Sequence, residues 1–158
     1  GARTLPDRPE GYRIAFESVS YRRAGADRDA VEELSFVLEP GERVALVGPS
    51  GAGKSTVLEL LQGYIRPTAG RILIDGIDMA ELSMADWRRR LSALPQRAHL
   101  FAGTVADNIR LSAPETSEAE VVEAARAAQA DRFIRLLPHG YETELGEALR
   151  LSGGQAQR

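Results

Sequence analysis

The chain of 158 residues carries a net charge of −3, contains no cysteine and is 43% hydrophobic, a composition that fits one soluble globular domain. The lack of cysteine excludes disulfide frameworks, thiolate zinc sites and thiol catalysis. The slightly acidic balance argues against a general nucleic-acid binder, and no nucleic-acid partner is expected.

The first half of the chain predicts strands around a central helix. Residues 1–11 hold prolines and charges without an apolar pattern, which predicts a linker. The alternation of residues 14–21, repeated over residues 34–38, predicts two antiparallel edge strands. The continuous apolar run Val44–Val47 predicts a strand buried on both faces, and apolar residues at helical spacing predict a helix that follows the next glycines and runs to about Tyr64.

The second half predicts a further pair of short strands and then helices. Strands are expected at residues 72–74 and 91–94. Between them Ser83 is expected to cap a helix. That helix carries Trp87, which is expected to pack, and an arginine run at residues 88–90, which is expected to form a solvated face with one member pairing an acid.

From residue 117 to about residue 137 the chain is rich in alanine and predicts helix. Ser117 and Glu120 have the spacing of a capping box, and a break is expected near Asp131. Strands, a glycine loop and helices in this order predict an α/β fold.

The use of lysine is unusual, because 19 of the 20 basic residues are arginine and only Lys54 is lysine. The lysine ammonium is compact and strongly hydrated, whereas the arginine guanidinium is flat, so the one lysine is a candidate functional residue.

Lys54 lies in a segment with the pattern of a phosphate-binding loop, glycine, four residues, glycine, lysine and a hydroxyl residue. Backbone N–H groups of such a loop can point at a phosphate, and the N-terminus of the following helix adds partial positive charge. Lys54 would reach the β- and γ-phosphates, and the Ser55 hydroxyl would bind Mg²⁺. The alternative, a strand-to-helix loop rich in glycine by chance, is disfavoured. The candidate residues are Gly48, Pro49, Ser50, Gly51, Ala52, Gly53, Lys54, Ser55 and Thr56.

A second candidate phosphate site lies about a hundred residues further on. Ser152 provides a hydroxyl, and Gly153 and Gly154 precede a predicted helix start, with Gln155 next to them. One nucleotide does not need two such sites in one chain.

Together the two segments resemble the Walker A and signature motifs of ATP-binding cassette (ABC) ATPases, a resemblance that covers residues 12–158. It implies a P-loop NTPase fold with an antiparallel β-subdomain and P-loop core over about 12–100 and a helical subdomain over about 101–158. The C-terminal third of that fold would be absent from these residues. ATP and Mg²⁺ are the implied cofactors, and residues 1–11 would be a linker from an upstream transmembrane domain.

Further segments resemble the exporter branch of the family. Gln96, with the following segment 100–109, is similar to the Q-loop region, which implies that Gln96 contacts Mg²⁺ and the attacking water and so is catalytic together with Lys54. Residues 143–147 resemble the loop that contacts the transmembrane part. Where exporters carry an adenine-stacking aromatic residue this chain has Arg23, so the adenine contact is left open between Tyr21 and Arg23.

The resemblance implies the ATP-binding domain of an ABC exporter. The signature would bind the ATP of a partner domain, in a head-to-tail homodimer or heterodimer, and the full-length protein would be an ATPase at the cytoplasmic face of a membrane. The Walker B strand, its glutamate base and the downstream histidine are not in these 158 residues. The chain alone is therefore expected to be a soluble, inactive piece of a longer protein.

Three other hypotheses concern the branch and the class of function. Residues 87–89, 101–109 and 155–158 look most like CydD-type exporters of thiol reductants. Alternatives from other classes are a soluble ABC-type ATPase without a transport role and a non-hydrolysing nucleotide-binding module.

Overall fold

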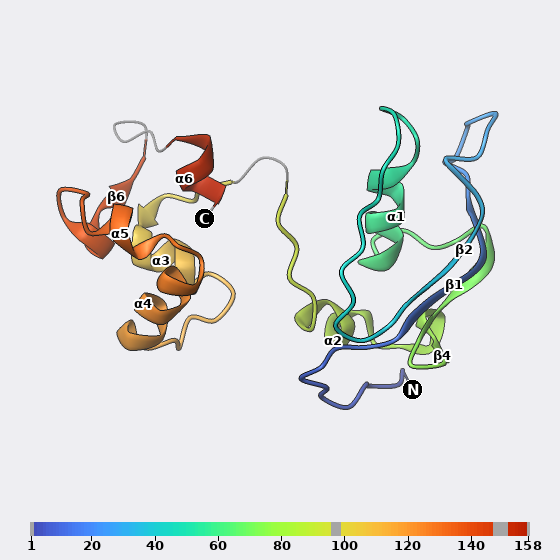
Figure 1. Ribbon diagram of the computed structural model, residues 1–158, viewed down its shortest axis with the longest axis horizontal. Helices are drawn as coiled ribbons and strands as arrows, with labels where there is room; N and C mark the ends of the chain where they lie inside the picture. The colour runs from blue at the N-terminus through green and yellow to red at the C-terminus, as the bar shows by residue number, and fades with distance from the viewer. Residues whose placement is uncertain (1, 96–98, 147–151, 158) are drawn as a thin grey trace. The chain divides into compact units, whose positions relative to one another are not determined.

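The computed structural model describes residues 2–95, 99–146 and 152–157. The chain divides into two compact units, residues 1–92 and 93–158, and each is described by itself (Figure 1). Over the described residues, no helix combines the length and the apolar character needed to cross a membrane.

The first unit contains an antiparallel sheet of four strands in the order β2-β1-β3-β4. The strands are β1 (Ile14–Tyr21), β2 (Val31–Leu38), β3 (Ala69–Ile74) and β4 (Ile77–Asp78). Phe16 lies opposite Phe36 on one side and Ile72 on the other, and the two phenylalanine rings stack with centroids 4.5 Å apart. The two predicted antiparallel strands and the strand at residues 72–74 are confirmed, although β1 is a central strand of this sheet.

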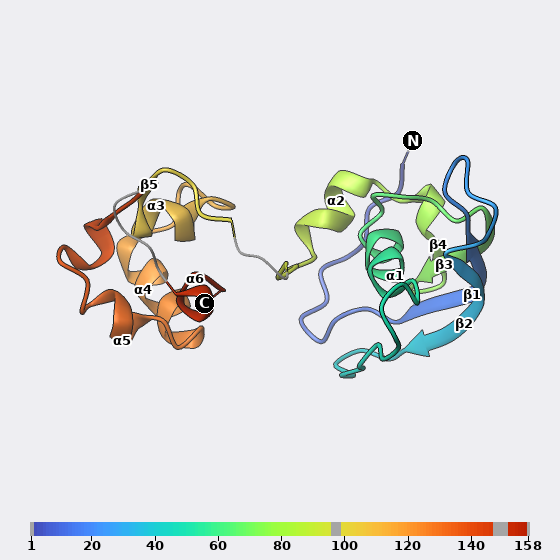
Figure 2. The same ribbon diagram turned by 90° about the horizontal axis from the view of Figure 1, so that it is seen from above.

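Helix α1 (Lys54–Leu61) lies beside the sheet (Figures 1 and 2). Its apolar side chains are buried in one cluster with those of the sheet. Val57 and Leu60, three residues apart, are buried with Val19 and Ile74 in one core. Because positions three and four apart share one helix face, this contact fixes which side of α1 faces the sheet. The start of α1 is thereby held at the end of the glycine loop.

Helix α2 (Met84–Arg89) completes this core after a short 3₁₀ turn, η1 (Met79–Glu81). As predicted, Ser83 is the N-cap, and its hydroxyl accepts a hydrogen bond from the Asp86 N–H. Trp87 is 1% exposed, which confirms its packing role. Its indole N–H donates to the carbonyl oxygen of Leu61 at 2.7 Å, so a polar atom on a buried ring is satisfied.

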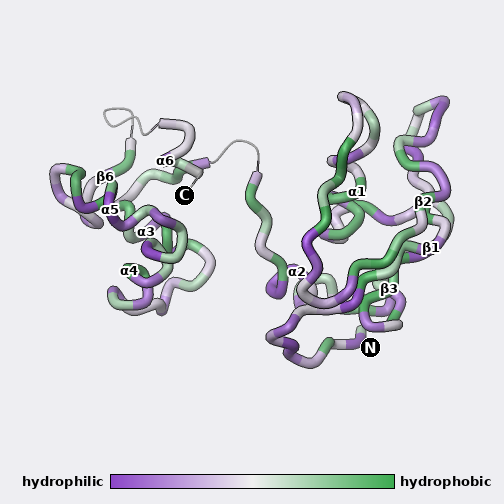
Figure 3. Tube along the Cα trace, viewed as in Figure 1, coloured by the Kyte–Doolittle hydropathy of each residue, from purple (hydrophilic) through white to green (hydrophobic). Residues whose placement is uncertain are grey.

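The strands predicted at residues 44–47 and 91–94 are not formed. Val44 is 56% exposed and Val47 is 88% exposed, in an extended segment that Figure 3 shows as an apolar stretch before α1. A strand requires a neighbour that shares its ladder of hydrogen bonds, and the described residues place none beside either segment. The apolar run indicates that the segment suits a buried environment. It does not indicate whether a partner strand is present.

The second unit is mainly helical. In this unit β5 (Gly103–Thr104) pairs antiparallel with β6 (Glu144–Leu145) over two residues. Between these strands lie α3 (Val105–Arg110), α4 (Glu118–Ala127), α5 (Asp131–Ile134) and the 3₁₀ turn η2 (Gly140–Glu142). The last described helix is α6 (Gly153–Gln157).

The ends of the helices in this unit follow the local sequence. The predicted capping box of Ser117 and Glu120 is present at the start of α4, and Thr104 and Asp107 form a second one at α3. The predicted break falls between α4 and α5, where Gln129 has a φ of 58°. Val105, Ala125, Ala130, Ile134 and Leu145 form the core.

Candidate functional site

The loop of residues 48–53 connects the extended segment to α1, and two of its glycines have left-handed backbone conformations. Gly51 has a φ of 84° and Gly53 a φ of 83°. A Cβ atom on Gly53 would lie 2.2 Å from the carbonyl oxygen of Ala30, whereas one on Gly51 would meet nothing within 4 Å. Glycine is therefore required at position 53 for conformation and space, and at position 51 for conformation alone.

The N-terminus of α1 is open to a ligand. Gly53 is the N-cap and provides no side-chain hydrogen bond to the first turn. The first N–H groups of a helix have no partner within the helix, and together they carry partial positive charge. A helix start of this kind, at the end of an exposed loop, suits an anion.

Lys54 reaches back over this loop. Its ammonium donates to the carbonyl oxygens of Gly48 at 2.8 Å and of Pro49 at 2.7 Å. The Ala52 N–H also donates to the Pro49 carbonyl, at 3.2 Å. The ammonium is thus held against the start of the loop by two backbone carbonyl groups.

The next two residues of α1 differ in exposure. Thr56 is buried, and Ser55 is exposed. Among the described residues, no cluster of His, Cys, Asp or Glu side chains could hold a metal ion. A single hydroxyl nevertheless fits Mg²⁺, which keeps several waters and takes its other ligands from bound phosphates.

Side chains of α2 hold the far end of α1. Besides the Trp87 bond to Leu61, the Arg88 guanidinium donates to the carbonyl oxygens of Gln62 at 3.1 Å and Gly63 at 2.7 Å, and it lies 4.9 Å from the Tyr64 ring centroid. Arg88 is exposed, in agreement with the predicted solvated arginine face, and its guanidinium also binds these carbonyl groups. The last carbonyl groups of a helix need partners, and an arginine located after a buried tryptophan supplies them.

The two candidates for an adenine contact lie near the end of β1. Tyr21 is the last residue of β1 and is half-buried. Arg23 is exposed, with Nη2 3.8 Å from Glu59 Oε2 of α1. Both residues belong to the unit that carries the loop, and the choice between them stays a prediction.

The candidate signature residues form the start of α6 in the second unit. The Ser152 hydroxyl accepts from the Gln155 N–H at 3.3 Å, and the Ser152 N–H donates to Gln155 Oε1 at 3.0 Å. A Cβ atom on Gly153 or Gly154 would meet nothing within 4 Å, so this surface is open. The loop residues belong to the first unit and the candidate signature residues to the second.

Gln96 lies outside the described residues, and its predicted role stays a prediction. The segment after it is held by Asn108, whose side chain accepts from the Phe101 N–H at 2.8 Å and donates to the carbonyl oxygens of Phe101 and Thr104, both at 3.0 Å. Phe101 remains exposed beside a largely apolar groove of about 680 Å³ in the second unit.

The segment expected to contact a transmembrane part is only partly at the surface. Thr143 and Leu145 are buried, and Glu144 and Gly146 are exposed. Glu147 lies outside the described residues. Alternation along β6 therefore leaves every second residue available to a partner.

Comparison with known proteins agrees with this geometry. A family model described as ABC transporter matches residues 31–158. An ATP-dependent lipid A-core flippase of Chromobacterium violaceum is 44% identical over 147 residues, which cover 92% of this chain and 25% of the flippase. A fatty acid ABC transporter ATP-binding/permease protein of Mycobacterium bovis is 43% identical over 146 residues, which cover 92% of this chain and 23% of that protein.

The fold is similar to a solved structure of a bacterial Atm1-family ABC exporter with ATP bound. The TM-score is 0.85 and the sequences are 41% identical, over 98% of this chain and 28% of the exporter chain. The expected α/β fold of an ABC ATPase, with an N-terminal antiparallel sheet, is thereby confirmed. The chain spans about a quarter of the length of these two relatives, and it belongs to the ABC transporter family.

Proposed function

We propose that this chain is the ATP-binding part of an ABC exporter and that the loop of residues 48–56 binds ATP with Mg²⁺. The observation that carries the proposal is the start of α1, where a glycine N-cap leaves the first turn open and the Lys54 ammonium lies over the same loop. Backbone N–H groups and the ammonium would bind phosphate oxygens, and the Ser55 hydroxyl would be a ligand of Mg²⁺.

The second part of the proposal concerns the partner domain. The open glycines at the start of α6 and the Ser152 hydroxyl would bind the ATP held by the loop of a second ABC domain, identical or paralogous, in a head-to-tail arrangement. Two ATP molecules would then be enclosed by two domains. This arrangement explains why one chain carries two phosphate-binding segments.

The third part is coupling to a membrane. The flippase and the exporter to which the chain is similar are named for transport, and they extend well beyond the matched region. A transmembrane part in the same protein would contact exposed residues of the second unit, among them Phe101 and Glu144. ATP hydrolysis in the full-length protein, with Gln96 near Mg²⁺ and water, would then drive export across the membrane from its cytoplasmic face.

The substrate is a separate question. The relatives include proteins named for lipid A-core and for fatty acids, which are chemically different. The similarity of residues 87–89, 101–109 and 155–158 to exporters of thiol reductants stays a prediction.

The experiment that tests the proposal is MgATP hydrolysis by the full-length protein in lipid nanodiscs, with Ser152→Ala and a matched control, Ser112→Ala. Ser112 is an exposed serine of the same unit. Removal of one hydroxyl that stabilises transferring phosphate is expected to lower kcat by about 10²-fold. The control is expected to keep the original rate.

The outcomes separate the alternatives. ATP binding without turnover in the unmodified protein would identify a non-hydrolysing module. Turnover by a protein that does not partition into membranes would identify a soluble ATPase. Equal rates for Ser152→Ala and Ser112→Ala would contradict the role of the signature.

A further inference from the structure

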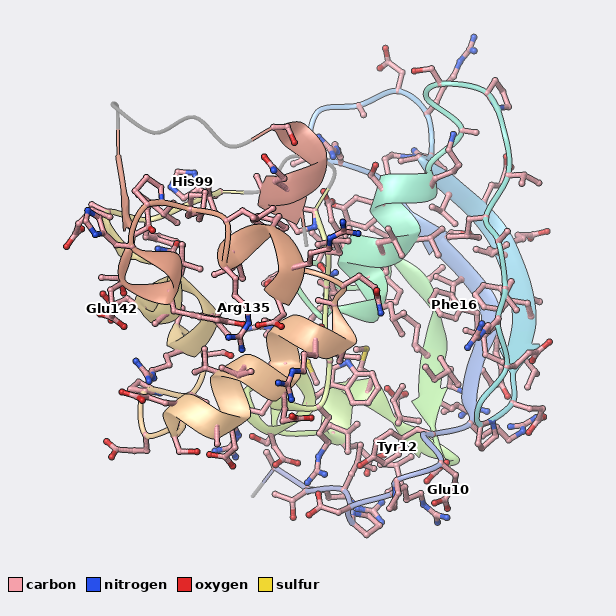
Figure 4. All side chains as sticks on the ribbon, turned by 60° about the vertical axis from the view of Figure 1, so that its left-hand side comes forward. Glu10, Tyr12, Phe16, His99, Arg135 and Glu142 are labelled. Carbon is pink, nitrogen blue, oxygen red and sulfur yellow. The ribbon has the colours of Figure 1, made fainter. Side chains whose placement is uncertain are left out.

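The segment for which a linker was predicted is part of the first unit. The Arg3 N–H donates to the Glu81 carbonyl oxygen at 2.8 Å, and the Ser83 N–H donates to the Arg3 carbonyl oxygen at 2.8 Å. Leu5 is buried in the same core as α1 and α2. We call residues 3–12 the entry segment; they lie along η1 and α2 before the chain enters β1, and Glu10 and Tyr12 are labelled in Figure 4.

Arg90, directly after α2, holds the entry segment by several bonds at once. Its guanidinium donates to the Leu5 carbonyl oxygen at 2.7 Å and to the Tyr12 hydroxyl oxygen at 3.0 Å, and it pairs with the Asp7 carboxylate. The Arg90 side chain is 17% exposed although it is charged. A charge with little access to solvent requires partners, and most of these are supplied by the entry segment.

Asp86, one turn before Arg90, holds both the arginine and the segment. Its carboxylate pairs with Arg90 Nε at 3.2 Å and accepts the Leu5 N–H at 3.3 Å. The hydrogen bond from Arg90 holds the pKa of the Asp86 carboxyl below its usual value. The segment therefore contacts the α2 region through an ion pair as well as through backbone bonds.

Helix α2 also contacts α1 through other side chains. The Tyr12 ring meets the Trp87 ring edge-on at 5.8 Å between centroids, and the Trp87 N–H donates to Leu61 at the end of α1. The Arg88 guanidinium donates to the carbonyl oxygen of Gly63, which lies two residues after Leu61. A continuous series of packed and hydrogen-bonded groups thus runs from the entry segment to the helix that begins at Lys54.

We infer that Arg90 is a positioning residue that couples the entry segment to the phosphate-binding loop through α2. The inference rests on the proposed function, because the ligand whose binding it transmits is MgATP. Coupling between two sites is reciprocal, so ATP binding at the loop stabilises the contact of the entry segment, and displacement of that segment weakens ATP binding.

The geometry requires arginine at this position. The guanidinium donates hydrogen bonds to four residues: the Leu5 carbonyl, the Tyr12 hydroxyl and the carboxylates of Asp7 and Asp86. A lysine ammonium keeps the charge but has neither the planar fork nor the reach of two terminal nitrogens. Arg90→Lys is therefore expected to recover only part of the effect that Arg90→Gln removes.

Hydrogen exchange of the full-length protein, followed by mass spectrometry with and without MgATP, tests the inference. The variants are Arg90→Gln, Arg90→Lys and a matched control, Arg89→Gln, in which the arginine side chain is 77% exposed and pairs with Asp86 at 3.3 Å. The two regions compared are residues 3–12 and residues 48–61.

With Arg90 present, MgATP is expected to slow exchange in both regions. Arg90→Gln is expected to raise the exchange rate of residues 3–12 by roughly tenfold, as loss of a local contact does, and to abolish the effect of MgATP on these residues. Protection of residues 48–61 by MgATP persists in that variant, and Arg89→Gln behaves as the unmodified protein. A purely structural role for Arg90 would not remove the response to MgATP.

Two results would overturn the inference, and they differ in what they say about the proposed function. If MgATP protects residues 48–61 but leaves residues 3–12 unchanged, or if Arg90→Gln keeps the response, Arg90 does not couple the two regions and ATP binding stands. If MgATP protects neither region, ATP binding at the loop is contradicted as well.

Discussion

The ammonium of Lys54 lies 2.8 Å from the carbonyl oxygen of Gly48, so the first residue of α1 closes the loop onto the residue at which the loop begins. This bond keeps a positive charge beside the uncapped helix start. In the proposed ATP site, a phosphate would meet an ammonium that is already held at the loop, which would lower the cost of ordering that side chain on binding.

The two left-handed glycines of the loop predict different effects of the same substitution. Gly51→Ala is expected to cost about 1–2 kcal/mol, the penalty of an L-residue in this conformation. Gly53→Ala is expected to cost more, because its Cβ atom would also collide with the Ala30 carbonyl oxygen. Urea unfolding of the two variants and titration with MgATP measure the difference. Equal losses at both positions would show that the Ala30 contact does not constrain the loop.

Trp87→Phe is expected to lower the free energy of unfolding by about 1–3 kcal/mol, because the partly buried Leu61 carbonyl loses its donor. Trp87 is the only tryptophan, so circular dichroism is the suitable probe for the variant. Arg89→Gln, at an exposed position of the same helix, is the control and is expected to be neutral. A Trp87→Phe variant as stable as the control would exclude a contribution of this bond.

Tyr141 gives a prediction for the second unit at alkaline pH. Burial of the phenol, together with its hydrogen bond to Asp131 at 2.7 Å, raises the pKa of Tyr141 to about 12 from 10.0. A raised pKa stabilises the fold while the phenol is protonated, so this contribution is complete below pH 10 and is lost as the pH rises to about 12. An absorbance titration should show a late phenolate step that is missing in Tyr141→Phe. If the phenolate step that is lost in Tyr141→Phe lies at the ordinary tyrosine pKa, the hydrogen bond to Asp131 is contradicted.

Local signals account for the parts of the fold that the sequence could predict. Alternation identified β1 and β2, and the spacing of Ser117 and Glu120 identified the start of α4, because each depends on neighbouring residues alone. The glycine–lysine pattern identified the loop for a similar reason. The residues proposed to bind ATP are nine consecutive ones, Gly48 to Thr56.

Features that depend on distant partners were not predicted. Residues 44–47 have the composition of a buried strand, but a ladder needs a second segment that no local pattern reveals. Arg90 gave one usable signal, its spacing of four residues from Asp86, which predicts an ion pair on a helix. Its bond to Leu5, 85 residues away in sequence, had no local sign.

Titration of the protein with MgATP, compared between the unmodified chain and Lys54→Ala, tests the central claim most directly. Arg43→Ala, which removes a positive charge from an exposed residue before the loop, is the matched control. Hydrogen bonds from a charged group contribute about 1.5–3 kcal/mol, so Lys54→Ala is expected to weaken binding about 10- to 100-fold. The control is expected to bind as the unmodified protein does. Equal affinities for Lys54→Ala and the unmodified protein would contradict the assignment of this loop as the ATP site.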